Sequence, residues 1–291
     1  MDDLRVVYHG QNRRDCADRA LVLSARSIPH QTLEDDAGLV IVVPASRSAE
    51  AAEELRRYDE ENEPTPAKPV QPVETHDPVP GVIAYLIAVV GIAWLASISA
   101  FGENWRFAGR VDGSLVRDGE LWRLFTALTL HGSLSHIVGN IVFGSLFGVF
   151  AGRYAGSGVA WLAILVSAAI GNGLNTLLLE ESHRSIGAST AVFAALGLAS
   201  GFAWRARVFA DGRWISRAGP IVAGLALLTY TGTGGPNTDI GAHLMGFVTG
   251  FGAGILLADR RSRLGSADLQ RGAAALAIGT LAIAWVLALA A

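Results

Sequence analysis

The second part of the chain alternates long uncharged apolar runs with short loops that carry most of its arginines. The runs cover residues 81–101, 131–151, 157–179, 187–204, 218–231, 240–258 and 271–290. Most of them are about twenty residues long, the length that an α-helix needs to cross a hydrocarbon layer of about 30 Å. The pattern predicts a mainly α protein, a polytopic bundle of about seven transmembrane helices.

In the first 62 residues the apolar positions form shorter patterns, which predict a small soluble α+β module. Alternating or short apolar runs suggest strands, and apolar residues at helical spacing suggest helices. The expected elements are strands at 4–8, 30–33 and 38–44 and helices at 14–27 and 48–61. Ser46 or Ser48 is the expected N-cap of the last helix.

Proline divides the two parts. Residues 63–80 are rich in proline, cannot sustain a helix and are expected to form an extended linker. We therefore divide the chain into a cytoplasmic module at 1–62, this linker, a six-helix core at 81–259 and a last loop with one extra helix at 260–291.

The placement of arginines predicts the orientation. Four follow the fourth run and four follow the sixth, namely Arg205, Arg207, Arg213, Arg217, Arg260, Arg261, Arg263 and Arg271. Under the positive-inside rule both loops are cytoplasmic. The start of the chain also lacks the pattern of a cleaved signal peptide. We expect a multi-pass protein of the cell (inner) membrane with a cytoplasmic N-terminus, an outside C-terminus and an outside loop at 102–130.

Composition excludes several classes of function. The net charge is -3 and no basic block suggests a nucleic-acid partner. One cysteine, Cys16, excludes an intrachain disulfide framework and is expected to be a buried small residue. The histidines lack carboxylate or cysteine neighbours at ligand spacing, so neither a metal nor another cofactor is expected. The sequence favours no oligomeric state.

Candidate chemistry lies at the outward ends of three runs. Ser189 begins the fourth run and His243 lies inside the sixth. A nucleophilic hydroxyl needs a base within hydrogen-bond reach, and an imidazole inside a membrane needs a partner or a polar cavity. The alternative for Ser189 is a small residue at a helix contact. If Ser189 and His243 form a pair, the serine has its base and the histidine has its partner inside the membrane.

Small residues provide a means for the two to meet. Gly246 and Gly250 form a GxxxG pair beside His243, which allows a neighbouring helix to approach closely. We expect that neighbour to be the fourth run, through the small-residue face that it presents at Gly187, Ala191 and Ala195.

Two further side chains can serve an acyl-transfer reaction. His136 and Asn140 lie four residues apart, hence on one helix face, and both can donate hydrogen bonds. Together with the Ser189 backbone N–H they would stabilise an oxyanion. The alternative is that they bond each other or a backbone carbonyl between helices.

Three polar residues near these ends have simpler explanations. Asp239 precedes His243 by four residues and is expected to cap its helix rather than complete a triad. His183 is expected to be solvated. His131 is expected to support the outer end of the second run.

Four separated motifs give the chain a resemblance to a known family. They are Glu120–Thr126 with Trp122 and Arg123, the run with His131, His136 and Asn140, Gly187-Ala188-Ser189, and Ala242–Gly246. In this order they resemble the rhomboid intramembrane serine proteases, over residues 81–259. The resemblance implies a catalytic dyad of Ser189 and His243, with His136 and Asn140 as oxyanion donors. It also implies a Trp122–Arg123 loop partly in the outer leaflet and a bacterial six-plus-one helix arrangement.

Two positions depart from the family pattern. Thr190 stands where the family has glycine, and its β-branched side chain is tolerated if its backbone is helical. Phe193 stands where many relatives have a tyrosine packed on the imidazole, so the ring is kept and the hydroxyl lost. Gly187, Phe193 and Gly246 are therefore expected to support the site, and neither departure removes a reacting group.

The predicted function is intramembrane serine endopeptidase. The expected partners are membrane lipid and single-span transmembrane or membrane-anchored substrates, cleaved near the outer side, with a small residue before the cleaved bond. The alternative is a catalytically inert rhomboid-like binder of transmembrane clients, which would normally lack Ser189 or His243. A channel or transporter is less favoured, because it would need charged residues along the depth of the bundle.

Overall fold

The computed structural model describes residues 3–35, 38–62, 74–178, 180, 182–208, 214–232 and 239–291. The chain separates into two compact units, Met1–Pro69 and Val70–Ala291. Most of the described residues are helical, which confirms the mainly α fold with a small α+β part.

The N-terminal unit is a three-stranded antiparallel sheet with two helices. The sheet order is β1-β3-β2. Its elements are β1 (Leu4–Gly10), α1 (Arg13–Ala25), β2 (Gln31–Asp35), β3 (Gly38–Pro44), the 3-10 turn η1 (Ala45–Arg47) and α2 (Ser48–Glu61). Four consecutive residues of β3, Val40 to Val43, are buried. Ile41 and Val43 pack in one core with Cys16 and Leu23 of α1.

The expected serine cap of α2 is wrong. Ser48 is the first helical residue, and its hydroxyl donates to the carbonyl of Ala45 at 2.9 Å. Because that bond closes the preceding 3-10 turn, the hydroxyl is not used for the free N–H groups of the helix.

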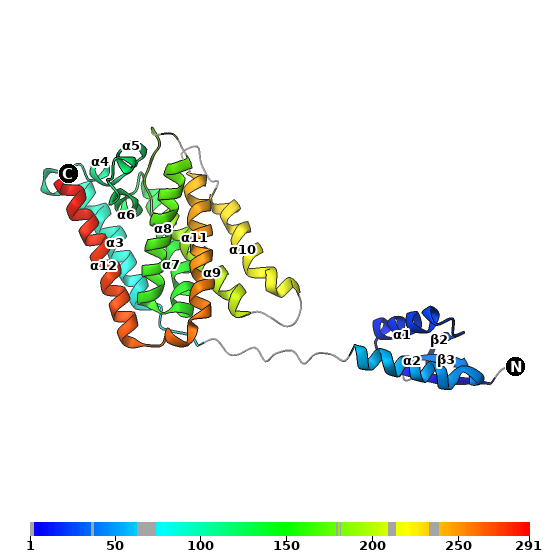
Figure 1. The fold of residues 1–291 in the computed structure, drawn as a ribbon. Coiled ribbons are helices and arrows are strands. Elements are labelled where there is room, and N and C mark those ends of the chain that lie inside the picture. The colour runs from blue at the N-terminus through cyan, green and yellow to red at the C-terminus, as the bar shows by residue number, and fades with distance from the viewer. Residues whose placement is uncertain are drawn as a thin grey trace. The chain divides into compact units, whose positions relative to one another are not determined.

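The described residues of the membrane unit form seven long helices, in the order of the seven apolar runs (Figure 1). They are α3 (Val79–Ser97), α7 (Leu134–Ala155), α8 (Ser157–Leu178), α9 (Ser189–Ala206), α10 (Trp214–Gly232), α11 (Ile240–Asp259) and α12 (Ala267–Ala290). Within the described residues, α3, α7, α8, α11 and α12 are long and apolar enough to cross a membrane.

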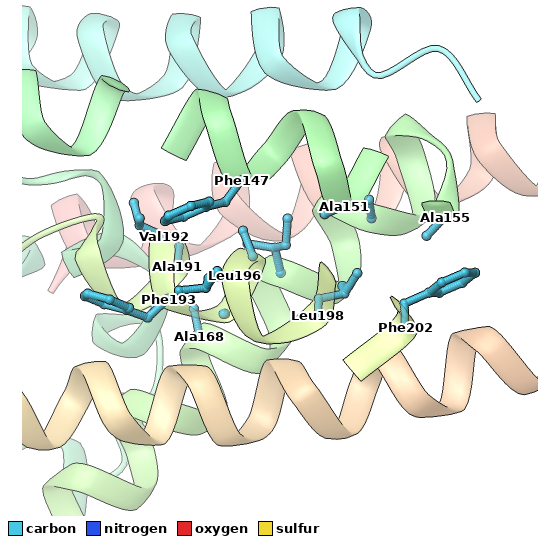
Figure 2. Packing of buried hydrophobic residues seen from close by; sticks show 14 of the residues in the cluster. Phe147, Ala151, Ala155, Ala168, Ala191, Val192, Phe193, Leu196, Leu198 and Phe202 are labelled. Carbon is cyan, nitrogen blue, oxygen red and sulfur yellow. The ribbon is translucent and has the colours of Figure 1, made fainter. Parts of the chain in front are cut away.

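Helix α9 is the central helix of the unit. All its residues from Thr190 to Ala203 are buried. Its apolar side chains pack with Phe147 and Ala151 of α7 and with Ala168 of α8 (Figure 2). Since protein surrounds this helix, it can carry small and polar residues that a helix facing lipid would not.

Glycines bring α9 and α11 into backbone contact. A side chain added to Gly250 would collide with the carbonyl of Ala194, and one added to Gly246 would approach the carbonyl of Thr190 at 2.5 Å. The predicted neighbour of the GxxxG pair is therefore correct. The contacting face differs, because it contains Thr190 and Ala194 where Gly187, Ala191 and Ala195 were expected.

The segment between α3 and α7 is a folded cap of short elements. They are η2 (Ala100–Gly102), α4 (Trp105–Gly109), β4 (Val111–Asp112), α5 (Gly113–Arg117), α6 (Arg123–Thr126) and η3 (Ala127–Thr129). Strand β4 pairs with β5 (Arg184–Ser185), which lies just before α9. These elements gather at the end of the bundle where α12 terminates, and the 3-10 turn η4 (Arg261–Arg263) precedes α12 at the other end (Figure 1).

Candidate active site

Ser189 is the first residue of α9, and Gly187, two residues before it, has a backbone conformation that favours glycine. Gly187 has φ +146°, a conformation that side chains rarely adopt, and its N–H donates to the carbonyl of Ala127 at 2.9 Å. A Cβ built on Gly187 would lie 2.6 Å from Cε1 of His136 and 3.4 Å from Oγ of Ser189. The His136 ring and the Ser189 hydroxyl therefore border the same small space.

His243 lies in the first turn of α11 and is buried. Its ring packs on that of Phe193, with centroids 4.5 Å apart and planes inclined by 38°. The close approach of Gly246, in the second turn of α11, to Thr190, in the first turn of α9, holds the starts of the two helices together. The structure thus brings the turn with the candidate base against the turn with the candidate nucleophile.

Thr190 is accommodated where the family pattern has glycine. It belongs to α9, and its φ is not positive. Its Cγ2 lies 3.0 Å from the point where a Cβ on Gly246 would stand. The absence of a side chain on Gly246 therefore leaves the space that the Thr190 methyl group needs.

The candidate oxyanion donors lie on α7. Ser133 caps this helix by accepting the His136 N–H at 3.2 Å. Asn140 is buried one turn further along, and its Nδ2 has no hydrogen-bond partner among the described residues. The ring of His131 meets that of His136 edge-on at 5.2 Å. Within the described residues, the Nδ2 group of Asn140 thus does not bridge helices.

A small recess adjoins Ser189. Its volume is about 10 Å³, which is about the room that one water molecule requires. Its lining includes the polar residues Asn172, Ser185, Ser189, Thr190 and Asp239. The recess can hold a water molecule beside the nucleophile.

Asp239 ties three segments together at this end of the bundle. Its carboxylate caps α11 by accepting the Ala242 N–H at 3.0 Å, which confirms the predicted cap. It also accepts from Nδ2 of Asn175 at 2.9 Å and bonds Nε2 of His183 at 2.9 Å. The prediction that His183 is solvated is wrong, because the loop before Ser189 folds back and places this ring on the carboxylate.

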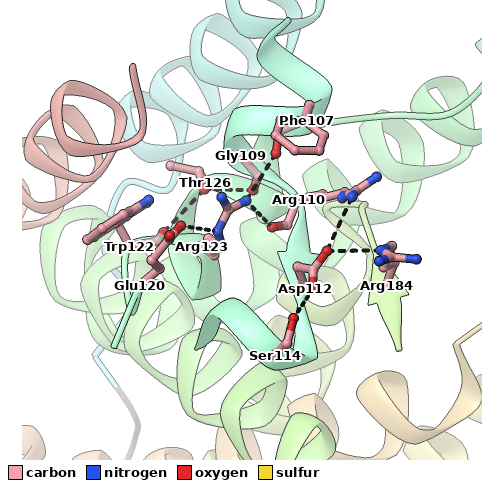
Figure 3. A network of polar contacts seen from close by, with 10 residues as sticks. All are labelled: Phe107, Gly109, Arg110, Asp112, Ser114, Glu120, Trp122, Arg123, Thr126 and Arg184. Atoms are coloured by element: carbon pink, nitrogen blue, oxygen red, sulfur yellow. Dashed lines mark hydrogen bonds and ion pairs between the residues drawn. The ribbon is translucent and has the colours of Figure 1, made fainter. Parts of the chain in front are cut away.

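The Trp122–Arg123 segment organises the cap. The Arg123 side chain is buried and donates to the carbonyls of Phe107 and Arg110 at 3.0 and 3.1 Å (Figure 3). Its charge is balanced by Glu120 at 2.6 Å. Trp122 packs at the edge of the apolar cluster beneath the cap.

A second ion cluster bonds the cap to the strand before Ser189. Asp112 is buried and accepts from Arg184 at 2.9 Å, Arg110 at 3.2 Å and Ser114 at 2.9 Å (Figure 3). Burial alone would raise the pKa of Asp112, but the bonds from Arg184 and Ser114 outweigh it and hold the pKa below its ordinary value. The sequence gives no spacing signal for this cluster, since Asp112 and Arg184 are far apart along the chain.

Comparisons with known proteins agree with these motifs. A family model described as Rhomboid domain matches residues 118–260. RHOMBOID-like protein 7 of Arabidopsis thaliana is 31% identical over 150 residues, which cover 50% of this chain and 45% of that protein. Rhomboid-like protease 1 of Toxoplasma gondii is 29% identical, and 49% of each chain is covered. Rhomboid protease GluP of Bacillus subtilis is 34% identical over 89 residues, 31% of this chain and 17% of that protein.

The chain spans about half the length of the first two of these relatives. The matched region contains the candidate serine, histidine and oxyanion residues, and five described helices have the length and composition of membrane spans. On this evidence the chain is a multi-pass membrane protein that belongs to the rhomboid family.

Proposed function

We propose that this protein is an intramembrane serine endopeptidase in which Ser189 is the nucleophile and His243 the base. The single observation that carries the proposal is the arrangement around Gly187. The Ser189 hydroxyl and the His136 ring border one small space there, and the His243 ring packs on Phe193, one turn after Ser189 in α9.

The chemistry follows from these positions. His243 accepts the Ser189 proton as the hydroxyl attacks the scissile carbonyl. The oxyanion that develops receives hydrogen bonds from His136, from the free amide of Asn140 and from the Ser189 N–H, each worth about 3 to 4 kcal/mol in such a site. The imidazolium then protonates the leaving amine. A water molecule, for which the recess beside Ser189 has room, hydrolyses the acyl-enzyme.

The proposed substrates are single-span or otherwise membrane-anchored proteins. Ser189 begins a helix that lies among apolar helices, so a peptide bond must reach it from within or beside the bilayer. The arginines after α9 and α11 support a cytoplasmic location for the opposite end of the bundle. Cleavage therefore takes place near the outer side, with the N-terminus inside and the C-terminus outside.

Cleavage in proteoliposomes tests the proposal. The purified chain is reconstituted with a panel of single-span reporter proteins, beside Ser189→Ala and His243→Ala variants. We expect the wild type to release a fragment and both variants to be inactive while keeping their helical content. A folded wild type that binds reporters without cleaving any of them would favour the inert binder instead.

A further inference from the structure

Helix α12 is held at both ends by polar side chains. Near its start, Gln270 donates to the carbonyl of Ala155 at 3.0 Å and accepts the N–H of Gly158 at 2.9 Å. This side chain thereby joins α12 to the turn between α7 and α8. These two hydrogen bonds fix the position of α12 along the axis of the bundle.

Near its other end, α12 carries a buried tryptophan. Trp285 lies 15 residues after Gln270, about 22 Å along an α-helix. Its Nε1–H donates to Oγ1 of Thr129 at 3.1 Å. Its ring packs on Trp105 of the cap, with centroids 4.7 Å apart. An indole N–H in apolar surroundings is costly unless it has an acceptor, and Thr129 supplies it.

Thr129 belongs to the turn that holds the loop before the nucleophile. Its own hydroxyl donates to the carbonyl of Thr126 at 2.8 Å and so closes the turn η3. The carbonyl of Ala127 in the same turn accepts the N–H of Gly187. Gly187 in turn borders both His136 and Ser189.

We propose that Trp285 is a positioning residue for catalysis, acting through Thr129 and the 127–129 turn on Gly187 and hence on Ser189 and His136. The seventh helix thus contributes to the geometry of the site without a group that touches substrate. This inference rests on the proposed protease function, because positioning is measured as turnover.

The test compares variants that remove the hydrogen bond between Trp285 and Thr129 from either side. Trp285→Phe keeps an aromatic ring and removes the donor, and Thr129→Val keeps the shape and removes the acceptor. Because small displacements of reacting groups slow reactions strongly, we expect each to lower kcat by about tenfold and leave KM within about twofold. Labelling of Ser189 by a fluorophosphonate probe should slow by the same factor.

Three controls test whether a loss of kcat comes from the hydrogen bond between Trp285 and Thr129. Trp94→Phe changes a largely exposed tryptophan of α3 and should keep the wild-type kcat. Thr129→Ser restores the hydroxyl and should recover most of the rate. If Trp285 acts through Thr129, the double variant should be no slower than Thr129→Val alone.

Hydrogen exchange separates this inference from the proposed function. In a Ser189→Ala background, Trp285→Phe should speed amide exchange in residues 124–137 and 183–191 and leave other segments unchanged. Wild-type kcat and unchanged exchange in Trp285→Phe would overturn the inference, as would a double variant in which the two losses multiply. A wild type that neither cleaves nor labels would instead refute the protease function, and exchange would still report on the contact.

Discussion

Gly187 is a residue whose backbone the site requires to be free of a side chain. Its positive φ is unfavourable for any side chain, and a Cβ there would collide with the His136 ring. Gly187→Ala should therefore lower cleavage by about 100-fold or more through displacement of reacting groups. Gly139→Ala is the matched control, because a Cβ at that position of α7 meets no atom within 4 Å. Equal rates for the two variants would show that the Gly187 backbone does not shape the site.

Asn140 differs from most buried polar residues in having an amide nitrogen without a partner among the described atoms. Replacement by alanine removes a donor that acts only when an oxyanion forms. We expect Asn140→Ala to lower kcat by about 10- to 10³-fold. Its thermal unfolding should change little, because no bond of that nitrogen is lost. A large loss of stability with normal kcat would show a structural role instead.

The sequence allowed the role of a residue to be predicted where a local pattern indicates that role. Ser189 and His243 were found because hydroxyl and imidazole groups are conspicuous in apolar runs, and the Asp239 cap because it precedes a helix directly. The bonds of His183 to Asp239 and of Trp285 to Thr129 join distant segments. Such pairs leave no spacing signal, so the sequence could not predict them.

At the scale of elements, α11 depends on the carboxylate at its start. Asp239→Ala should destabilise the fold by about 1 to 2 kcal/mol through loss of the cap, measured as a lower Tm. Asparagine is an equally good cap, so Asp239→Asn should restore most of the stability.

The same pair of variants distinguishes a cap from a triad member. If Asp239 only caps α11 and holds Asn175 and His183 by hydrogen bonds, the rate of cleavage by Asp239→Asn should stay within about tenfold of wild type. A loss of about 10⁴-fold, the size seen when a triad carboxylate becomes an amide, would contradict this.

Helix boundaries show what apolar patterns can and cannot predict. The second run was expected to begin at residue 131, yet α7 starts at Leu134 because Ser133 caps it. It also continues beyond the apolar run to Ala155 and ends before Gly156, whose φ is +80°. The short helices of the cap were missed altogether, because bonds such as those of Arg123 to two carbonyls define them rather than any periodicity.

At the scale of the whole molecule, cleavage near the outer side requires that the cap and the active-site end face outward. The variants Glu103→Cys and Ser262→Cys, each in a Cys16→Ala background, test this orientation at two exposed positions at opposite ends. An impermeant thiol reagent added to intact cells should label the cysteine at 103 and not the one at 262. The reverse labelling would refute the arginine-based topology and the outward-facing site.

The central claim is that Ser189 is a nucleophile activated by His243, and covalent labelling tests it most directly. The detergent-solubilised protein is treated with a fluorophosphonate, and the modified residue is identified by mass spectrometry. We predict one adduct per chain, at Ser189, with no adduct in Ser189→Ala and labelling slowed by at least about 100-fold in folded His243→Ala. Labelling of another residue, or undiminished labelling of Ser189 without His243, would contradict the account.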